Sequence, residues 1–162
     1  MKFLYFVAIS FILVCKTINA QTIPDSEFHW VEDEQCYPQG ICLQTFVKVE
    51  QDPVLTQFNS QEFNDLIGNL IDQLNLDENV GGIIKLKLLI AENQNLCVTR
   101  IGTKEIKLSE FHFNEITNML SSIYKFKLGK QRNVEVNCLG ILYINITGGK
   151  MEEIKNVNFS IG

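Results

Sequence analysis

The residues best suited to acid–base or nucleophilic chemistry are few and widely spaced. The chain has only two histidines, His29 beside Trp30 and His112 between two phenylalanines. A hydrolase needs a nucleophile held beside an oriented base, and the sequence contains neither a Gly-Xaa-Ser-Xaa-Gly elbow nor a glycine-rich phosphate loop. His112 therefore fits a partly buried structural position and His29 a surface position. We expect no catalytic residue and a protein that is not an enzyme.

The cysteines offer a second kind of chemistry. Beyond residue 20 they are Cys36, Cys42, Cys97 and Cys138. A proline and a glycine lie between Cys36 and Cys42, and they favour the turn that brings two cysteine Cα atoms within about 7 Å. We predict a disulfide between these two residues. Cys97 and Cys138 fall in apolar runs, where a bridge and buried free thiols both fit. With no Cys-Xaa-Xaa-Cys spacing, we expect no metal site and no cofactor.

The first twenty residues have the pattern of a secretory signal peptide. Lys2 precedes an uncharged run from Phe3 to Cys15, and the small residue Ala20 suits a cleavage site. The uncharged run is shorter than the roughly 20 residues that span a bilayer. We expect residues 1–20 to be removed and the protein to be exported, periplasmic or secreted. The alternative is an uncleaved segment that anchors the protein in an inner membrane.

Composition fits one soluble domain with a real core. Of the 162 residues, 46% are hydrophobic and 20% are charged. Removing residues 1–20 takes two of the 14 basic residues and none of the 19 acidic ones, which leaves a formal net charge of −7. Such a balance argues against a nucleic-acid-binding surface.

Residues 21–58 form a lead-in segment. They hold all three prolines, a local acidic cluster and the predicted disulfide. We expect at most one short strand there, between Leu43 and Glu50. The order of this segment depends on docking to the domain formed by residues 59–148.

Periodic apolar residues begin after Asn59. Helical spacing predicts one helix capped by Ser60 and a second capped by Ser109, with Gly129 stopping the chain after it. Extended patterns predict strands over residues 83–90, 96–101 and 134–146. The predicted fold is a two-layer α+β domain over residues 59–148, in which two helices cover a three-stranded antiparallel sheet in the order helix, strand, strand, helix, strand.

The last of these strands is expected beside the first, antiparallel to it, and therefore at an edge of the sheet. A long apolar edge is a template for pairing, which proteins either use or shield. The tail, residues 149–162, carries Val157, Phe159 and Ile161 at alternate positions, as a further strand would. The edge is thus either free for a partner or covered by this tail.

Two segments resemble the C-terminal domain of TonB-type energy transducers. They are Val80-Gly81-Gly82-Ile83-Ile84-Lys85-Leu86 and Tyr124-Lys125-Phe126-Lys127-Leu128-Gly129-Lys130-Gln131-Arg132-Asn133-Val134-Glu135-Val136, within a similarity over residues 60–148. The resemblance implies a periplasmic domain that captures an extended segment of an outer-membrane receptor along its last strand, in the service of transmembrane transport.

Carried over to this sequence, the resemblance assigns partner binding to alternate residues of the last strand and to basic residues of the turn before it. These are Val134, Val136, Leu139, Ile141, Tyr143, Lys125, Lys127, Lys130 and Arg132. Strand addition would supply affinity through the backbone and selectivity through side chains.

The chain also departs from that family. Leu128 stands where the family usually has proline, and no proline-rich spacer is present to span a periplasm. Partner binding is therefore the part of the family role that we expect here. The alternative is a small secreted domain with a structural, self-associating or inhibitory role, including a homodimer through the edge strand.

Overall fold

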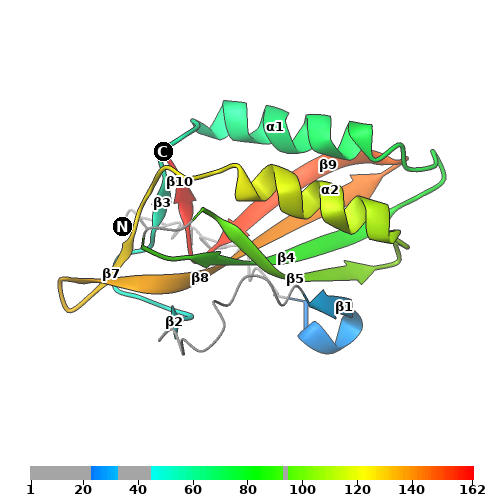
Figure 1. Cartoon of the computed structure of the whole chain (residues 1–162). Coiled ribbons are helices and arrows are strands. Elements are labelled where there is room, and N and C mark those ends of the chain that lie inside the picture. The colour runs from blue at the N-terminus through cyan, green and yellow to red at the C-terminus, as the bar shows by residue number, and fades with distance from the viewer. Residues whose placement is uncertain (1–22, 33–44, 93–94) are drawn as a thin grey trace, which may run out of the picture.

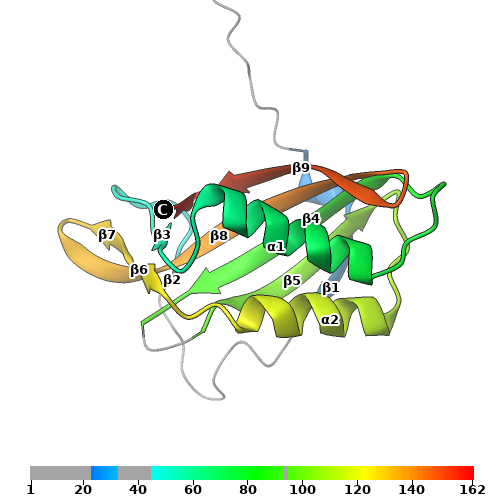
Figure 2. The ribbon, with the colours of Figure 1, turned by 90° about the horizontal axis from the view of Figure 1, so that it is seen from above.

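Two amphipathic α-helices lie side by side on one face of a β-sheet (Figures 1 and 2). The computed structural model describes residues 23–32, 45–92 and 95–162. The expected signal peptide and the Cys36–Cys42 pair lie outside these residues. Among the described helices, none is long and apolar enough to cross a membrane.

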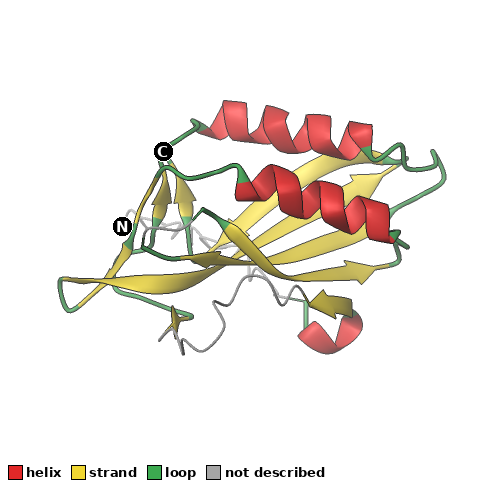
Figure 3. Ribbon diagram, viewed as in Figure 1, coloured by secondary structure: helices red, strands yellow, loops and turns green. Residues whose placement is uncertain are grey.

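The described part of the chain contains two α-helices, one short 3-10 helix and ten strands (Figure 3). They are η1 (Asp25–Glu27), β1 (His29–Glu32), β2 (Thr45–Phe46), β3 (Val54–Leu55), α1 (Ser60–Gln73), β4 (Gly82–Ile90), β5 (Cys97–Lys104), α2 (Glu110–Ser121), β6 (Phe126–Lys127), β7 (Gly129–Gln131), β8 (Val134–Thr147), β9 (Lys150–Val157) and β10 (Ser160–Ile161).

Both helices begin with a reciprocal capping box. At α1 the Asn59 side chain accepts from the Glu62 N–H, and the Glu62 carboxylate accepts from the Asn59 N–H. The cap is therefore one residue earlier than the Ser60 expected from the sequence. At α2 the cap is Ser109, and His112 takes the place that Glu62 holds in α1.

The predicted three-stranded sheet is wrong. The main sheet has seven strands, with the order β1-β5-β4-β8-β2 and with β7 and β9 also paired to β8. A second sheet of three strands has the order β10-β3-β6. The fold is mostly β, with 44% strand and two helices.

The missed strands have a common cause: they lack a long apolar run. β1, β3, β6 and β7 have two to four residues each, too few for a period-two pattern to stand out. β2 lies within the one strand expected between Leu43 and Glu50, but β1 and β3 belong to the same lead-in, so the expectation of at most one strand there is wrong. The tail, expected as a possible further strand, forms β9 and β10. Gly129 also lies in β7 and does not end a helix, because α2 stops at Ser121.

The expectation that residues 134–146 form an edge of the sheet is wrong as well. β8 pairs antiparallel with β4 along one side, as expected. Its other side is occupied, since Ile141–Thr147 pair with β9 and Asn137–Cys138 pair with β2. Phe159, which follows β9, packs over Gly140, where a Cβ would come within 2.8 Å of the phenylalanine ring. The tail therefore covers the strand.

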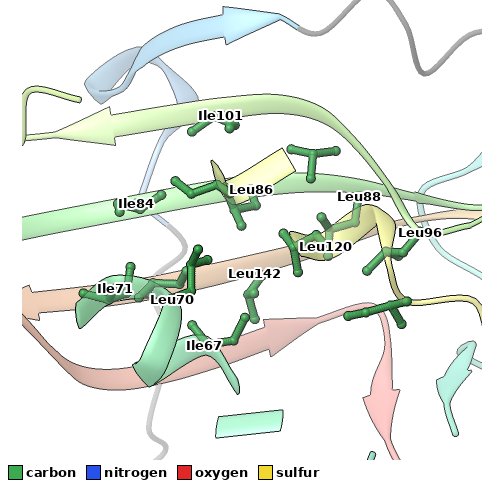
Figure 4. Close-up of a cluster of buried hydrophobic side chains, with 14 of the residues drawn as sticks. Ile67, Leu70, Ile71, Ile84, Leu86, Leu88, Leu96, Ile101, Leu120 and Leu142 are labelled. Atoms are coloured by element: carbon green, nitrogen blue, oxygen red, sulfur yellow. The ribbon is translucent and has the colours of Figure 1, made fainter. Parts of the chain in front are cut away.

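The core lies between the helices and the sheet (Figure 4). Alternate residues of β4, namely Ile84, Leu86 and Leu88, face the helices and are fully buried. Together with Ile67 and Ile71 of α1 they form part of one buried hydrophobic cluster. α1 packs against β9 and α2 packs against β5, so each helix covers one half of the sheet.

Candidate functional site

The strand residues proposed from the resemblance are all in β8, but the backbone that they were expected to offer is already paired. Val134 and Val136 lie opposite Gln131 and Gly129 of β7. Ile141 and Tyr143 lie opposite Val157 and Lys155 of β9. Leu139 pairs with Leu89 of β4. Strand addition at β8 would require β7 or β9 to leave first.

The four basic residues expected beside that strand are spread along a segment bonded to residues 50–56. The Lys125 carbonyl accepts from the Thr56 N–H, and Lys127 pairs with Val54. Lys130 exchanges backbone hydrogen bonds with Gln51. The Arg132 N–H donates to the Glu50 carboxylate at 3.0 Å. Their backbones therefore build the second sheet and the β7 turn.

Four strands of the main sheet pair with only one described strand: β1, β2, β7 and β9. β2 and β7 have two and three residues, so the longer outer edges are those of β9, beyond β8, and of β1, beyond β5. Half of the residues of β9 are charged, and all four of these residues are exposed. Glu152 and Glu153 also accept hydrogen bonds from side chains of β8. Alternating charges of this kind protect an edge from pairing. β1 differs, because its outer edge faces an apolar hollow.

The hollow beside β1 is a cavity of about 610 Å³ between β1, the loop after β5 and the start of α2. Its apolar lining comes from Val31, Ile106, Leu108 and Phe113, and its remaining lining residues are His29, Thr103, Glu105 and Lys107. This volume is within the range of cavities that bind small ligands and side chains.

A second hollow of about 440 Å³ continues along β1 under α2. It shares Val31 and Phe113 with the first cavity, so the two lie next to each other. Its other lining residues are Glu32, Ile101, Glu110, Asn114, Thr117 and Asn118. We call the two hollows together the β1–α2 groove. The helix-facing side of β1 and β5 forms one wall of this groove, and α2 forms the other.

β1 is held in place by a cluster on the opposite face of the sheet, which we call the lysine–aromatic cluster: Asp25, Phe28, Trp30, Lys85, Lys87 and Tyr143. The Asp25 carboxylate binds the ammonium groups of Lys85 and Lys87, each at 2.6 Å. Lys85 Nζ also lies 5.1 Å from the centre of the Phe28 ring and 4.9 Å from that of Tyr143.

Trp30 joins this cluster to β1 itself. Its ring lies over Gly102, where a Cβ would come within 2.9 Å of the indole, and its Nε1 donates to the Asp25 carbonyl at 2.9 Å. Lys87 Nζ lies 4.6 Å from the indole centre. Two further ion pairs, Lys104–Glu27 and Arg100–Glu32, both at 2.6 Å, bind the same segment to β5. Residues 25–32 of the lead-in are therefore docked on the domain.

The electrostatics of Lys85 do not favour an amine nucleophile. Burial alone would lower the pKa of its ammonium group, but hydrogen bonds with Asp25 and Tyr143 outweigh burial and raise the pKa above 10.5. Hydrogen bonds from the two lysines lower the pKa of Asp25 below 3.8. A catalytic lysine needs a lowered pKa, so this cluster is built for charge pairing.

The described cysteines are in different states. Cys97 is disulfide-bonded. Cys138 is a buried free thiol, and burial raises its pKa. The disulfide of Cys97 is therefore not formed with Cys138. Across the described residues, no three histidine, cysteine or acidic side chains gather as metal ligands would.

Reasoning from the sequence missed the residues that form the groove. His29 and Val31 point toward the helix side, while Phe28 and Trp30 lie on the lysine side. This alternation over residues 28–31 is the signal that could have identified a strand. The helix wall, Phe113, was placed correctly on a helix but was not connected to the lead-in.

The comparisons with known proteins offer no second route to the function. No family model, curated protein or solved structure matches this chain. The role of the β1–α2 groove must therefore be inferred from its geometry.

Proposed function

We propose that the protein is an exported binding module that captures an extended segment of a partner protein by strand addition to β1. The observation that carries this proposal is the outer edge of β1, which has no partner strand in the described structure and faces an apolar cavity under α2. In an antiparallel ladder, alternate residues direct N–H and C=O groups away from the paired strand. Those groups are the natural partners for an added strand.

Strand addition is the binding mode that the TonB resemblance implies, but the proposed edge is different. The resemblance points to the long strand β8, whose free side β9 covers. The new edge lies at the far end of the sheet, beyond β5. The proposal includes a role in outer-membrane transport only if the captured partner is an outer-membrane receptor.

The expected affinity is modest. A four-residue edge offers few hydrogen bonds, each worth about 0.5–1.5 kcal/mol net. One apolar side chain buried in the groove adds about 1.5–3 kcal/mol. Since a dissociation constant of 1 μM corresponds to about −8 kcal/mol, we expect binding in the micromolar range or weaker.

The test starts with peptides selected from a random heptapeptide library on the folded protein. A selected peptide is then titrated into isotope-labelled protein, and backbone amide shifts are followed by NMR. We expect shift changes in β1 and in residues 105–118. Failure to retain any peptide, or shift changes confined to β9, would overturn the proposal.

A pair of valine variants separates the new site from the one suggested by the resemblance. Val31 and Val134 are both exposed, at 36% and 62%. Val31→Asp should abolish peptide binding, because it places a carboxylate in the groove, whereas Val134→Asp should leave binding unchanged. The opposite result would return the site to β8. Thermal unfolding of both variants checks that the fold is kept.

A further inference from the structure

The β1–α2 groove consists of two hollows with different linings, and the difference bears on which partner it fits. Four of the eight residues that line the first cavity are apolar, and Glu105 and Lys107 contribute opposite charges. The second hollow is lined by Glu110, Asn114 and Asn118 of α2 and by Glu32, whose carboxylate is paired with Arg100 of β5.

The two hollows follow one another along β1. The first begins at His29 and the second ends at Glu32, and Val31 belongs to both. In an extended peptide, side chains two residues apart point to the same side and are about 6.6 Å apart. A strand added to β1 would thus direct one side chain into the first cavity and its second neighbour toward the second hollow.

Charge favours a basic residue at the second position. Glu32 is already bound to Arg100 at 2.6 Å, while Glu110 lies at the first turn of α2. None of the residues that line the second hollow is a lysine or an arginine. The chain as a whole carries a formal charge of −5, so its long-range field also attracts a basic segment.

We infer that the groove selects an extended partner segment with an apolar side chain in the first cavity and a lysine or arginine two residues away. This inference rests on the proposed strand addition to β1 and gives it a partner chemistry. The apolar residue supplies most of the discrimination, because it is the one removed from water. The basic residue adds a smaller preference that depends on salt.

A synthetic peptide can present this pattern in either chain direction. In acetyl-Thr-Lys-Thr-Leu-Thr-Lys-Thr-amide a lysine stands two residues before and two residues after the leucine, so parallel and antiparallel addition both place one lysine at the second hollow. Two matched peptides replace the leucine with serine, or both lysines with glutamate. Dissociation constants are measured by isothermal titration calorimetry at low salt and at 0.5 M NaCl.

We expect the serine peptide to bind at least about tenfold more weakly than the leucine peptide, at both salt concentrations. At low salt the glutamate peptide should bind at least roughly threefold more weakly than the lysine peptide. At high salt the two dissociation constants should become similar. Glu110→Gln should reduce the lysine preference and keep the leucine preference. Glu153→Gln, on the opposite edge of the sheet, is the control and should change neither.

The outcomes separate the two levels of the proposal. If the three peptides bind with equal affinity and shift the amides of β1, strand addition stands and the inferred selectivity is overturned. If the leucine preference is seen but Glu110→Gln leaves the lysine preference unchanged, the basic position is assigned wrongly. If none of the peptides binds, and library selection also yields none, strand addition itself fails.

Discussion

Lys85 carries a positive charge on a side chain that is only 4% exposed. An enclosed ammonium group is stable only where charged and polarisable partners replace water. Asp25 and two flanking rings do so here, and both Asp25 and Phe28 belong to the segment that leads into β1. The desolvation free energy of the Lys85 ammonium group is therefore offset while residues 25–28 are docked on the sheet.

Replacing Asp25 with asparagine tests this dependence. Asp25→Asn keeps the shape but removes the negative charge that faces both lysines. We expect the free energy of unfolding to fall by about 1–2 kcal/mol, toward the low end for charged hydrogen bonds, because the Asp25 side chain is 52% exposed. The measurement is urea unfolding at pH 7. Glu27→Gln, which breaks the more exposed pair with Lys104, is the matched control and should cost less.

The pH dependence of this difference gives an internal check. The folded pKa of Asp25 lies below 3.8, so its contribution is present above that pH and is lost as the pH falls through the folded pKa. The stability difference between wild type and Asp25→Asn should accordingly shrink below about pH 4. A difference that stayed constant down to pH 2 would mean that the carboxylate charge is not its source.

The outer edges of β9 and β1 show how the same sheet can present opposite kinds of edge. β9 carries two lysines and two glutamates, whereas β1 borders an apolar cavity. We infer that the charged residues of β9 prevent other chains from pairing with its edge.

Removing that protection should change the behaviour of the protein in solution. In the double variant Glu153→Val and Lys155→Val, the β9 edge becomes apolar while its unpaired backbone is unchanged. We expect more self-association than in wild type at the same concentration, measured by size-exclusion chromatography with light scattering. A double variant on the exposed surface of α1, Asp65→Val and Asp72→Val, has no strand edge and should not associate more. Equal behaviour of the two double variants would show that hydrophobicity alone is responsible.

The elements that could be predicted from the sequence are those with long apolar periods. Phe63 and Ile67 mark the buried face of α1, and Ile84 and Leu86 mark that of β4. Their patterns are local, so neighbouring residues suffice to define them. β1 was missed because its four residues give only a short alternation and its partner strand, β5, is distant in the sequence.

At the scale of the whole molecule, the site eluded prediction because its two walls come from distant parts of the chain. Val31 and Phe113 are brought together only when β1 joins β5 and α2 packs on the same strand. The sequence instead favoured Val134 to Tyr143, a single continuous strand with a recognisable turn before it. Its covering by β9 was one of two alternatives, because the alternation of Val157, Phe159 and Ile161 marked the tail only as a possible further strand.

The disulfide at Cys97 should contribute to global stability. Loss of a native disulfide from a small secreted domain costs about 2–5 kcal/mol. We expect a reducing agent to lower the midpoint of urea unfolding in wild type, and the variant Cys97→Ala to be less stable than wild type and to lose less stability on reduction. Cys138→Ala serves as the control and should respond to reduction as wild type does, because its thiol is free. A Cys97→Ala protein that kept full stability and still responded to reduction would contradict the prediction.

The docking of the lead-in has a consequence for the order of folding. Asp25 and Lys85 are 60 positions apart in the chain, whereas β4 and β5 form a local hairpin. Closing a long loop is entropically costly, so the hairpin and its helices are expected to assemble before β1 joins them. The same few contacts are the first to be lost in a partial opening. The β1–α2 groove is thus expected to form last and to open first, while the core remains folded.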